Sequence, residues 1–217
     1  MGAVRGKFGR RPGKYVVLAI AVVVLIAASV VWWQWPVDEE EKLALPSRVC
    51  RGTFSGSVFK PFFEEDEGKL RTKVDREFPE YPAEFPVCEL SGDTSRVSFR
   101  IEELLAARES RKEMKASHRQ VAELGPAYGA TWQYGGTIGL YMPCPSSENS
   151  RAHIYMNVGS SAAKMRETNV KAANKGMRKL AHLTSYTART LAHKYQCKGA
   201  DELPDGPVQL RAGDGKL

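Results

Sequence analysis

Four cysteines are the residues of this chain whose chemistry the sequence defines best, and they are Cys50, Cys88, Cys144 and Cys197. They form no CxxC motif and stand beside no cluster of histidines, so their spacing does not favour a metal site. All four follow a long apolar segment that predicts export of the residues after it. An even number of cysteines in an oxidising compartment predicts two disulfide bonds, and we expect no metal and no cofactor.

The pairing of these cysteines has three alternatives, which sequence alone does not separate. We favour Cys50–Cys88, which would tie the start of the domain to a first β-hairpin. We also favour Cys144–Cys197, which would tie the end of a strand to the end of a long helix. Each bond closes a loop of about 40 to 55 residues, worth roughly 4 kcal/mol in the chain-entropy model.

The other candidates for chemistry do not form a recognised catalytic motif. The chain has no GxSxG, no HExxH and no histidine pair at metal spacing. His182 and His193 would lie about 16 Å apart along one helix, too far to share a metal ion. Ser160 or Ser161 with His153 could be imagined as nucleophile and base, as in any small secreted domain. We therefore expect no enzyme activity, and an envelope hydrolase or transferase with an unrecognised active site is the alternative.

Residues 15–35 form an apolar segment that carries no charge. A helix of about 21 residues is just long enough to cross a hydrocarbon core of ~30 Å. Trp32, Trp33 and Trp35 stand where an outer aromatic belt is expected. The segment predicts a single transmembrane helix, and cleavage as a signal peptide near Ala27-Ala28-Ser29 is the alternative.

The charges on either side of this segment predict its orientation. Residues 1–14 contain five basic residues and no acid, whereas residues 36–46 begin with an acidic cluster and form a short stalk. The positive-inside rule then places the N-terminus in the cytoplasm and the chain after residue 35 outside the plasma membrane. Since the formal net charge is +7, the rest of the chain carries only +2. The positive net charge therefore comes mainly from the N-terminal residues that orient the membrane segment. We expect no nucleic-acid partner.

Residues 47–198 are expected to form one extracytoplasmic α+β domain, followed by a disordered tail at 199–217. Two hairpins are predicted at 87–101 and 137–158, and helices at 58–65 and 102–124. The glycine- and aromatic-rich residues 128–136 are expected to be a loop. A long helix, beginning near Asn169 and ending near Cys197, should cover the small antiparallel sheet.

The long helix carries a basic stripe opposite its apolar stripe. Eight Lys or Arg residues between residues 161 and 197 face one acid, Glu167. A solvated helix face is the simplest interpretation of this stripe. The functional hypothesis is docking on phospholipid headgroups, a polyanionic wall polymer or an acidic envelope protein, strengthened by histidine charge in mild acid. The residues proposed to bind are Lys171, Lys175, Arg178, His182, Arg189 and His193.

The overall pattern resembles uncharacterised single-pass extracytoplasmic proteins of actinobacteria. The residues that carry the resemblance are the basic start and single span, then Leu45-Pro46-x-x-x-Cys50, Met142-Pro143-Cys144-Pro145 and Tyr195-Gln196-Cys197. The resemblance implies a place in the cell envelope and no particular activity. The sequence thus predicts a membrane-anchored interaction or scaffold module.

Overall fold

The computed structural model describes residues 43–74, 87–116, 120–132, 136–145, 149–163 and 170–213. The predicted cytoplasmic tail, transmembrane helix and most of the acidic stalk lie outside these residues. Among the described residues, no helix has the length and apolar character needed to cross a membrane.

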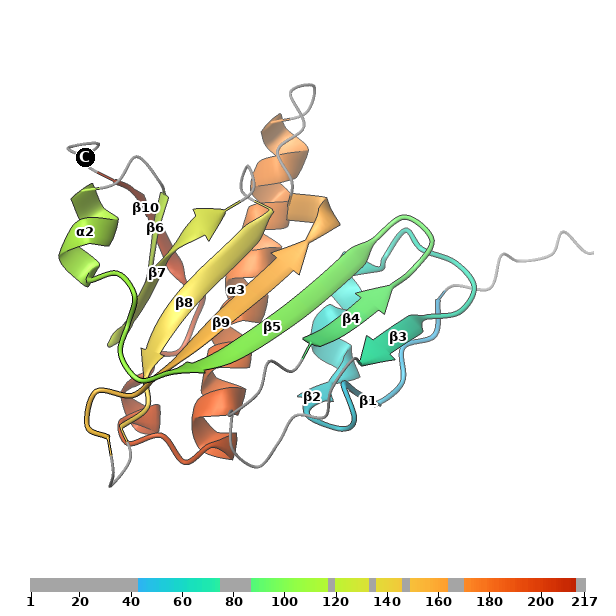
Figure 1. Ribbon diagram of the computed structural model, residues 1–217. Coiled ribbons are helices and arrows are strands. Elements are labelled where there is room, and N and C mark those ends of the chain that lie inside the picture. The colour runs from blue at the N-terminus through green and yellow to red at the C-terminus, as the bar shows by residue number, and fades with distance from the viewer. Residues whose placement is uncertain are drawn as a thin grey trace, which may run out of the picture. The chain divides into compact units, whose positions relative to one another are not determined.

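The architecture is α+β, with one large antiparallel sheet and one long helix (Figure 1). The sheet has eight strands among the described residues, in the order β10-β6-β7-β8-β9-β5-β4-β3. Both predicted hairpins are confirmed as β4–β5 and β8–β9, and β9 pairs with β5 in the centre of the sheet. The strands are β3 (Arg71–Val74), β4 (Val87–Ser91), β5 (Arg96–Leu104), β6 (Gln120–Leu124), β7 (Ala127–Trp132), β8 (Thr137–Pro143), β9 (His153–Ser160) and β10 (Gln209–Ala212).

The helix α3 (Val170–Lys194) covers one face of this sheet, as the sequence predicts (Figure 1). Alternate strand residues point to the same face, so Phe99, Val158 and Ile138 form one row across β5, β9 and β8. All three are buried in the same core as Leu180 and Leu191 of α3. Burial of this apolar face is the main force that holds the helix on the sheet.

A smaller cluster lies on the opposite face of the sheet. The short helix α2 (Arg111–Ala116) buries Met114 there, beside Tyr141. Tyr128, Tyr141 and Tyr155 occupy facing positions on β7, β8 and β9, with ring centroids 5.7 and 4.6 Å apart. This second face is therefore partly covered by α2 and partly open.

The segment that precedes the sheet packs against both the sheet and the helix α3. Two short strands, β1 (Arg48–Val49) and β2 (Phe54–Ser55), precede a 3-10 helix, η1 (Gly56–Phe62). The predicted helix at 58–65 is thus a tighter 3-10 helix, beginning two residues earlier. Phe54 and Phe59 are fully buried against Phe99, with ring centroids 5.1 and 5.6 Å from its ring, so they belong to the core.

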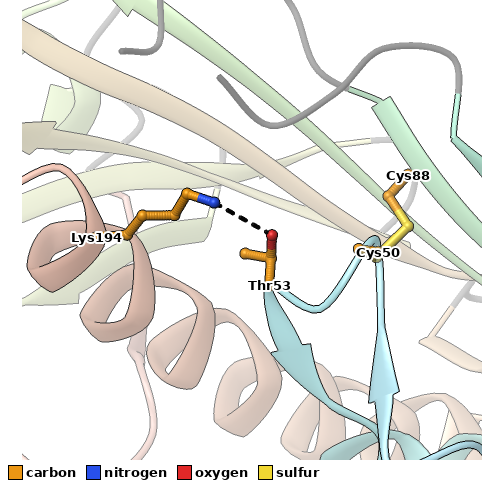
Figure 2. The surroundings of a disulfide bond; sticks show 4 residues. All are labelled: Cys50, Thr53, Cys88 and Lys194. Atoms are coloured by element: carbon orange, nitrogen blue, oxygen red, sulfur yellow. Dashed lines mark hydrogen bonds between the residues drawn. A yellow bond between two sulfur atoms is a disulfide. The ribbon is translucent and has the colours of Figure 1, made fainter. Parts of the chain in front are cut away.

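Both predicted disulfides are confirmed. Cys50–Cys88 joins the turn after β1 to β4, and Cys144–Cys197 joins the end of β8 to the residues after α3. Figure 2 shows the first bond beside a second link, in which Lys194 Nζ donates to Thr53 Oγ1 at 3.5 Å. The turn between β1 and β2 is therefore attached to the sheet through Cys50 and to the end of α3 through Thr53.

Three further predicted elements differ from the structure. The helix expected at 102–124 is replaced by the end of β5, by α2 and by β6, and the loop expected at 128–136 contains most of β7. Residues 199–213 of the expected disordered tail contain a 3-10 helix, η3 (Ala200–Glu202), and β10. Since β10 pairs with β6 from far along the sequence, a local window cannot reveal the partner.

Candidate binding surfaces on the two sides of the sheet

The outer side of α3 presents three exposed basic side chains along its first half. Lys175, Arg178 and His182 fall at helical spacings of three and four residues, so they line one side of the helix. The whole of α3 spans 25 residues and contains no acidic residue. None of these three side chains forms a salt bridge with another described residue. We call Lys175, Arg178 and His182 the basic patch.

The structure does not bring all the predicted stripe residues together. Arg189 Nη1 donates to Ser185 Oγ at 2.6 Å and to the carbonyl of Pro204 at 2.9 Å, so it fastens the chain after α3 to the helix. His193 is exposed near the end of the helix, about 16 Å along the axis from His182. The backbone of Lys171 lies in the first turn of α3, and its side chain lies outside the described part of the structure.

The serines and the histidine considered as a catalytic pair lie at opposite ends of β9. His153 begins the strand and Ser160 ends it, which separates them by roughly 24 Å. The His153 Nδ1 atom is 2.8 Å from the carbonyl oxygen of Arg151. The described residues also contain no group of three His, Cys, Asp or Glu side chains that could hold a metal ion. The geometry therefore provides no nucleophile–base pair at these positions.

A polar hollow of about 360 Å³ lies at one end of the sheet face that α3 leaves uncovered. Its walls come from the β4–β5 turn at 91–96, from 136–137 and from 159–161, together with Arg71 and Ser98. Seven of the lining residues carry a hydroxyl group. The hollow has no local sequence signal, because its residues come from five separate strands and their turns.

The buried carboxylate of Asp66 fixes the turn that forms one wall of the hollow. Its Oδ1 atom accepts hydrogen bonds from the backbone N–H of Thr94 at 2.6 Å, the Thr94 hydroxyl at 3.0 Å and the backbone N–H of Ser95 at 3.1 Å. Burial would raise the pKa of Asp66, but the hydrogen bonds from Ser95 and Thr94 together lower it below its ordinary value. The carboxylate is therefore ionised at neutral pH. Gly92 is required beside it, since a Cβ there would lie 2.6 Å from Asp66 Cγ.

Two strand glycines form the floor of the uncovered face. A Cβ at Gly159 would lie 2.9 Å from Ser98 Oγ and 3.2 Å from Thr137 Oγ1. A Cβ at Gly139 would lie within 2.8 Å of polar atoms of three side chains, Tyr155, Asn157 and Trp132. Isolated glycines within a strand pattern mark close approaches of this kind, and they are the sequence signal that could have located this face.

The tyrosine row on the same face is suited to packing rather than to acid–base chemistry. Burial raises the pKa of Tyr141 to about 12, and the neighbouring Tyr155 adds to the shift. Tyr128 donates its hydroxyl to the carbonyl of Glu109 at 3.0 Å, which ties the residues before α2 to the sheet. At neutral pH these side chains are uncharged hydrogen-bonding and packing groups.

A comparison of the chain with protein-family models, with curated proteins and with solved structures found no match.

Proposed function

We propose that this chain is an extracytoplasmic interaction module of the cell envelope that docks on an anionic partner through the basic patch on α3. The observation that carries the proposal is the charge of this helix. Its exposed side presents Lys175, Arg178 and His182, and its 25 residues include no acid that would neutralise them. A helix face that served only solubility would more often mix charges of both signs.

Two features support the proposed location outside the plasma membrane. The apolar segment 15–35 follows a basic tail and precedes an acidic stalk, the charge order of a single span with its N-terminus inside. The described domain holds two disulfide bonds, which persist in oxidising compartments and are rare in the cytosol. A single-pass protein of the plasma membrane fits both features.

The spacing of the patch suits a flat or extended anionic partner. Residues 175 and 182 are about 10 Å apart along the helix axis, so all three side chains can reach one surface together. Near an anionic membrane each Lys or Arg contributes about 1 kcal/mol. This attraction is lost beyond a Debye length of ~10 Å at 0.1 M salt. The partner would be anionic headgroups, a polyanionic wall polymer or an acidic envelope protein.

No observation favours the alternative of a hydrolase or transferase. Ser160 and His153 are separated by the length of β9, and the other serines of the hollow have no histidine among its lining residues. We therefore do not propose a reaction for this domain.

The test compares two charge reversals of equal size in a fragment spanning the compact unit Glu40–Leu217. Lys175→Glu with Arg178→Glu changes the patch, and Lys69→Glu with Lys112→Glu changes two exposed lysines elsewhere by the same total charge. Binding would be measured by flotation with vesicles containing phosphatidylglycerol and by titration with polyphosphate, at low and high salt. Vesicles without anionic lipid serve as the blank.

We expect the unchanged fragment to bind at least one of the two probes at low salt and to release it at high salt. The patch variant should bind at least about 30-fold more weakly, as expected for the loss of two residues worth about 1 kcal/mol each, while the control variant should lose much less. Equal losses in the two variants, or no binding to either probe at low salt, would contradict the proposal.

A further inference from the structure

We propose that the polar hollow at the end of the uncovered sheet face binds an uncharged sugar ring of a carbohydrate. This inference uses a different face of the domain from the basic patch and does not depend on docking by α3. It rests on three properties of the hollow: its walls are held in place before any ligand arrives, carboxylates offset the positive charge of its two guanidinium groups, and its lining is rich in hydroxyl groups.

The walls are joined to one another by hydrogen bonds. Asp66 anchors the backbone of Thr94 and Ser95 in the β4–β5 turn. The backbone N–H of Arg96 donates to Ser161 Oγ at 2.9 Å, and the backbone N–H of Ser160 donates to the carbonyl of Gly136 at 2.9 Å. The three lining segments therefore form a connected frame, and a ligand would not have to order them on binding.

The charges around the hollow argue against an anionic ligand. Two guanidinium groups, those of Arg71 and Arg96, line it. Arg96 Nε already lies 3.3 Å from Glu89 Oε1, Asp93 lines the hollow, and ionised Asp66 lies beneath the turn. One carboxylate of the lining, that of Asp93, and two that lie behind the lining, those of Glu89 and Asp66, thus offset the two guanidinium groups. A phosphate or sulfate would gain little net attraction here, whereas a neutral ligand meets donors and acceptors of both kinds.

The hydroxyl groups match the hydrogen bonding of a sugar. Each Ser or Thr hydroxyl can donate one hydrogen bond and accept others, as sugar hydroxyls do. Ser160 Oγ accepts from the backbone N–H of Ala162 and Ser161 Oγ from that of Arg96, so both O–H groups keep their proton for a ligand. Ser98 and Thr137 stand on either side of Gly159, where the missing side chain leaves their hydroxyls at the floor of the hollow.

The dimensions of the hollow also suit a sugar. A volume of about 360 Å³ lies near the lower end of small-molecule sites, which span roughly 300–1,000 Å³. Trp132 of β7 pairs with Thr137 of β8, but its indole does not line the hollow, and its Nε1 lies beside Gly139. The lining is therefore polar, and the hydroxyls of a sugar ring can point to Ser98 and Thr137.

The experiment uses the full chain in a detergent without a sugar headgroup, because many mild detergents carry one. Isothermal titration would be run with glucose, galactose, mannose and N-acetylglucosamine, with the disaccharides maltose, lactose and chitobiose, and with inorganic phosphate. The test variant Thr137→Val with Ser98→Ala removes two hydroxyls from the floor. The matched control Thr72→Val removes an exposed hydroxyl of β3 that does not line the hollow. Thermal unfolding of each variant checks that the domain still folds.

We expect at least one neutral saccharide to bind in preference to phosphate. Its affinity should fall about tenfold or more in the double variant and stay within twofold in Thr72→Val, since each lost hydrogen bond costs a severalfold change. The proposal is overturned if no saccharide in this set binds at tens of millimolar, if phosphate binds more tightly than every saccharide, or if the folded double variant binds as well as the unchanged chain. If the double variant does not fold, Asp93→Asn in the rim replaces it, with the same expected loss and the same contrary result.

Discussion

Asp66 shows how one buried carboxylate can set the geometry of a turn 28 residues away in sequence. Its Oδ1 atom collects three donors from Thr94 and Ser95, and Gly92 leaves the room that the carboxyl group needs. Asp66→Ala would leave those donors without their acceptor. We expect it to lower the free energy of unfolding by about 3 kcal/mol, measured by urea denaturation. Asp93→Ala in the same turn is exposed and should change it by less than about 0.5 kcal/mol; equal effects would contradict this role.

The lowered pKa of Asp66 also predicts how stability depends on pH. A carboxylate with a folded pKa below its unfolded value stabilises the fold at pH above the unfolded value, and this contribution is lost as pH falls through the folded pKa. We expect the stability difference between the unchanged chain and Asp66→Asn to be constant near neutrality and to shrink below about pH 4. If this stability difference instead grew as the pH fell, the pKa of Asp66 would be raised in the folded state rather than lowered.

Two tyrosine hydroxyls, one with a hydrogen-bond partner and one without, allow a matched comparison. Tyr195 Oη is buried and has no hydrogen-bond partner among the described residues, and burial raises its pKa to about 12. Tyr128 Oη donates to the carbonyl of Glu109. Removing a buried hydroxyl without a partner relieves a desolvation cost, so Tyr195→Phe should raise the free energy of unfolding by roughly 1 kcal/mol. Tyr128→Phe should lower it by about the same amount, and a loss in both variants would contradict the assignment.

At the scale of elements, the chain after α3 is part of the fold. Leu203 and Val208 are buried, the backbone N–H of Val208 donates to the carbonyl of Ala181, and β10 covers the edge of β6. A chain that ends at Lys198 loses both buried side chains, each worth about 1.5–3 kcal/mol. We expect a fall in unfolding free energy of at least about 3 kcal/mol, measured by denaturation of the truncated and complete chains. A truncated chain of unchanged stability would support the disordered tail that composition predicts.

The sequence predicted an element correctly where the element's own residues showed a clear pattern of apolar and polar side chains. The helix α3 and the hairpin strands β4, β5, β8 and β9 have clear apolar periodicity, and they appear where expected. The edge strand β10 is short and polar, and it forms because it pairs with β6, far back along the chain. The basic patch was predictable because its residues lie close together in sequence on one helix. The hydrogen bond from Arg189 to the carbonyl of Pro204 was not predictable, because it depends on how the chain folds back after α3. The hollow could not be foreseen because it depends on contacts such as that of Asp66 with Thr94.

At the scale of the whole domain, the two disulfides close loops of sequence separation 38 and 53. The chain-entropy model assigns about 4 kcal/mol to each. Cys144→Ser with Cys197→Ser should therefore lower the free energy of unfolding by about that amount, measured by denaturation under non-reducing conditions. Because the bond joins β8 to the residues after α3, this pair should also loosen β10. A loss under 1 kcal/mol would show that packing alone holds these elements together.

The central claim is that this disulfide-bonded domain lies outside the plasma membrane, and topology tests it most directly. Two fusions after Leu217 would be compared in cells, one with a phosphatase that is active only outside and one with a reporter active only in the cytoplasm. The charge order around residues 15–35 predicts activity from the phosphatase fusion alone. Activity from the cytoplasmic reporter alone would contradict the location, the use of the disulfides and the proposed docking partner together.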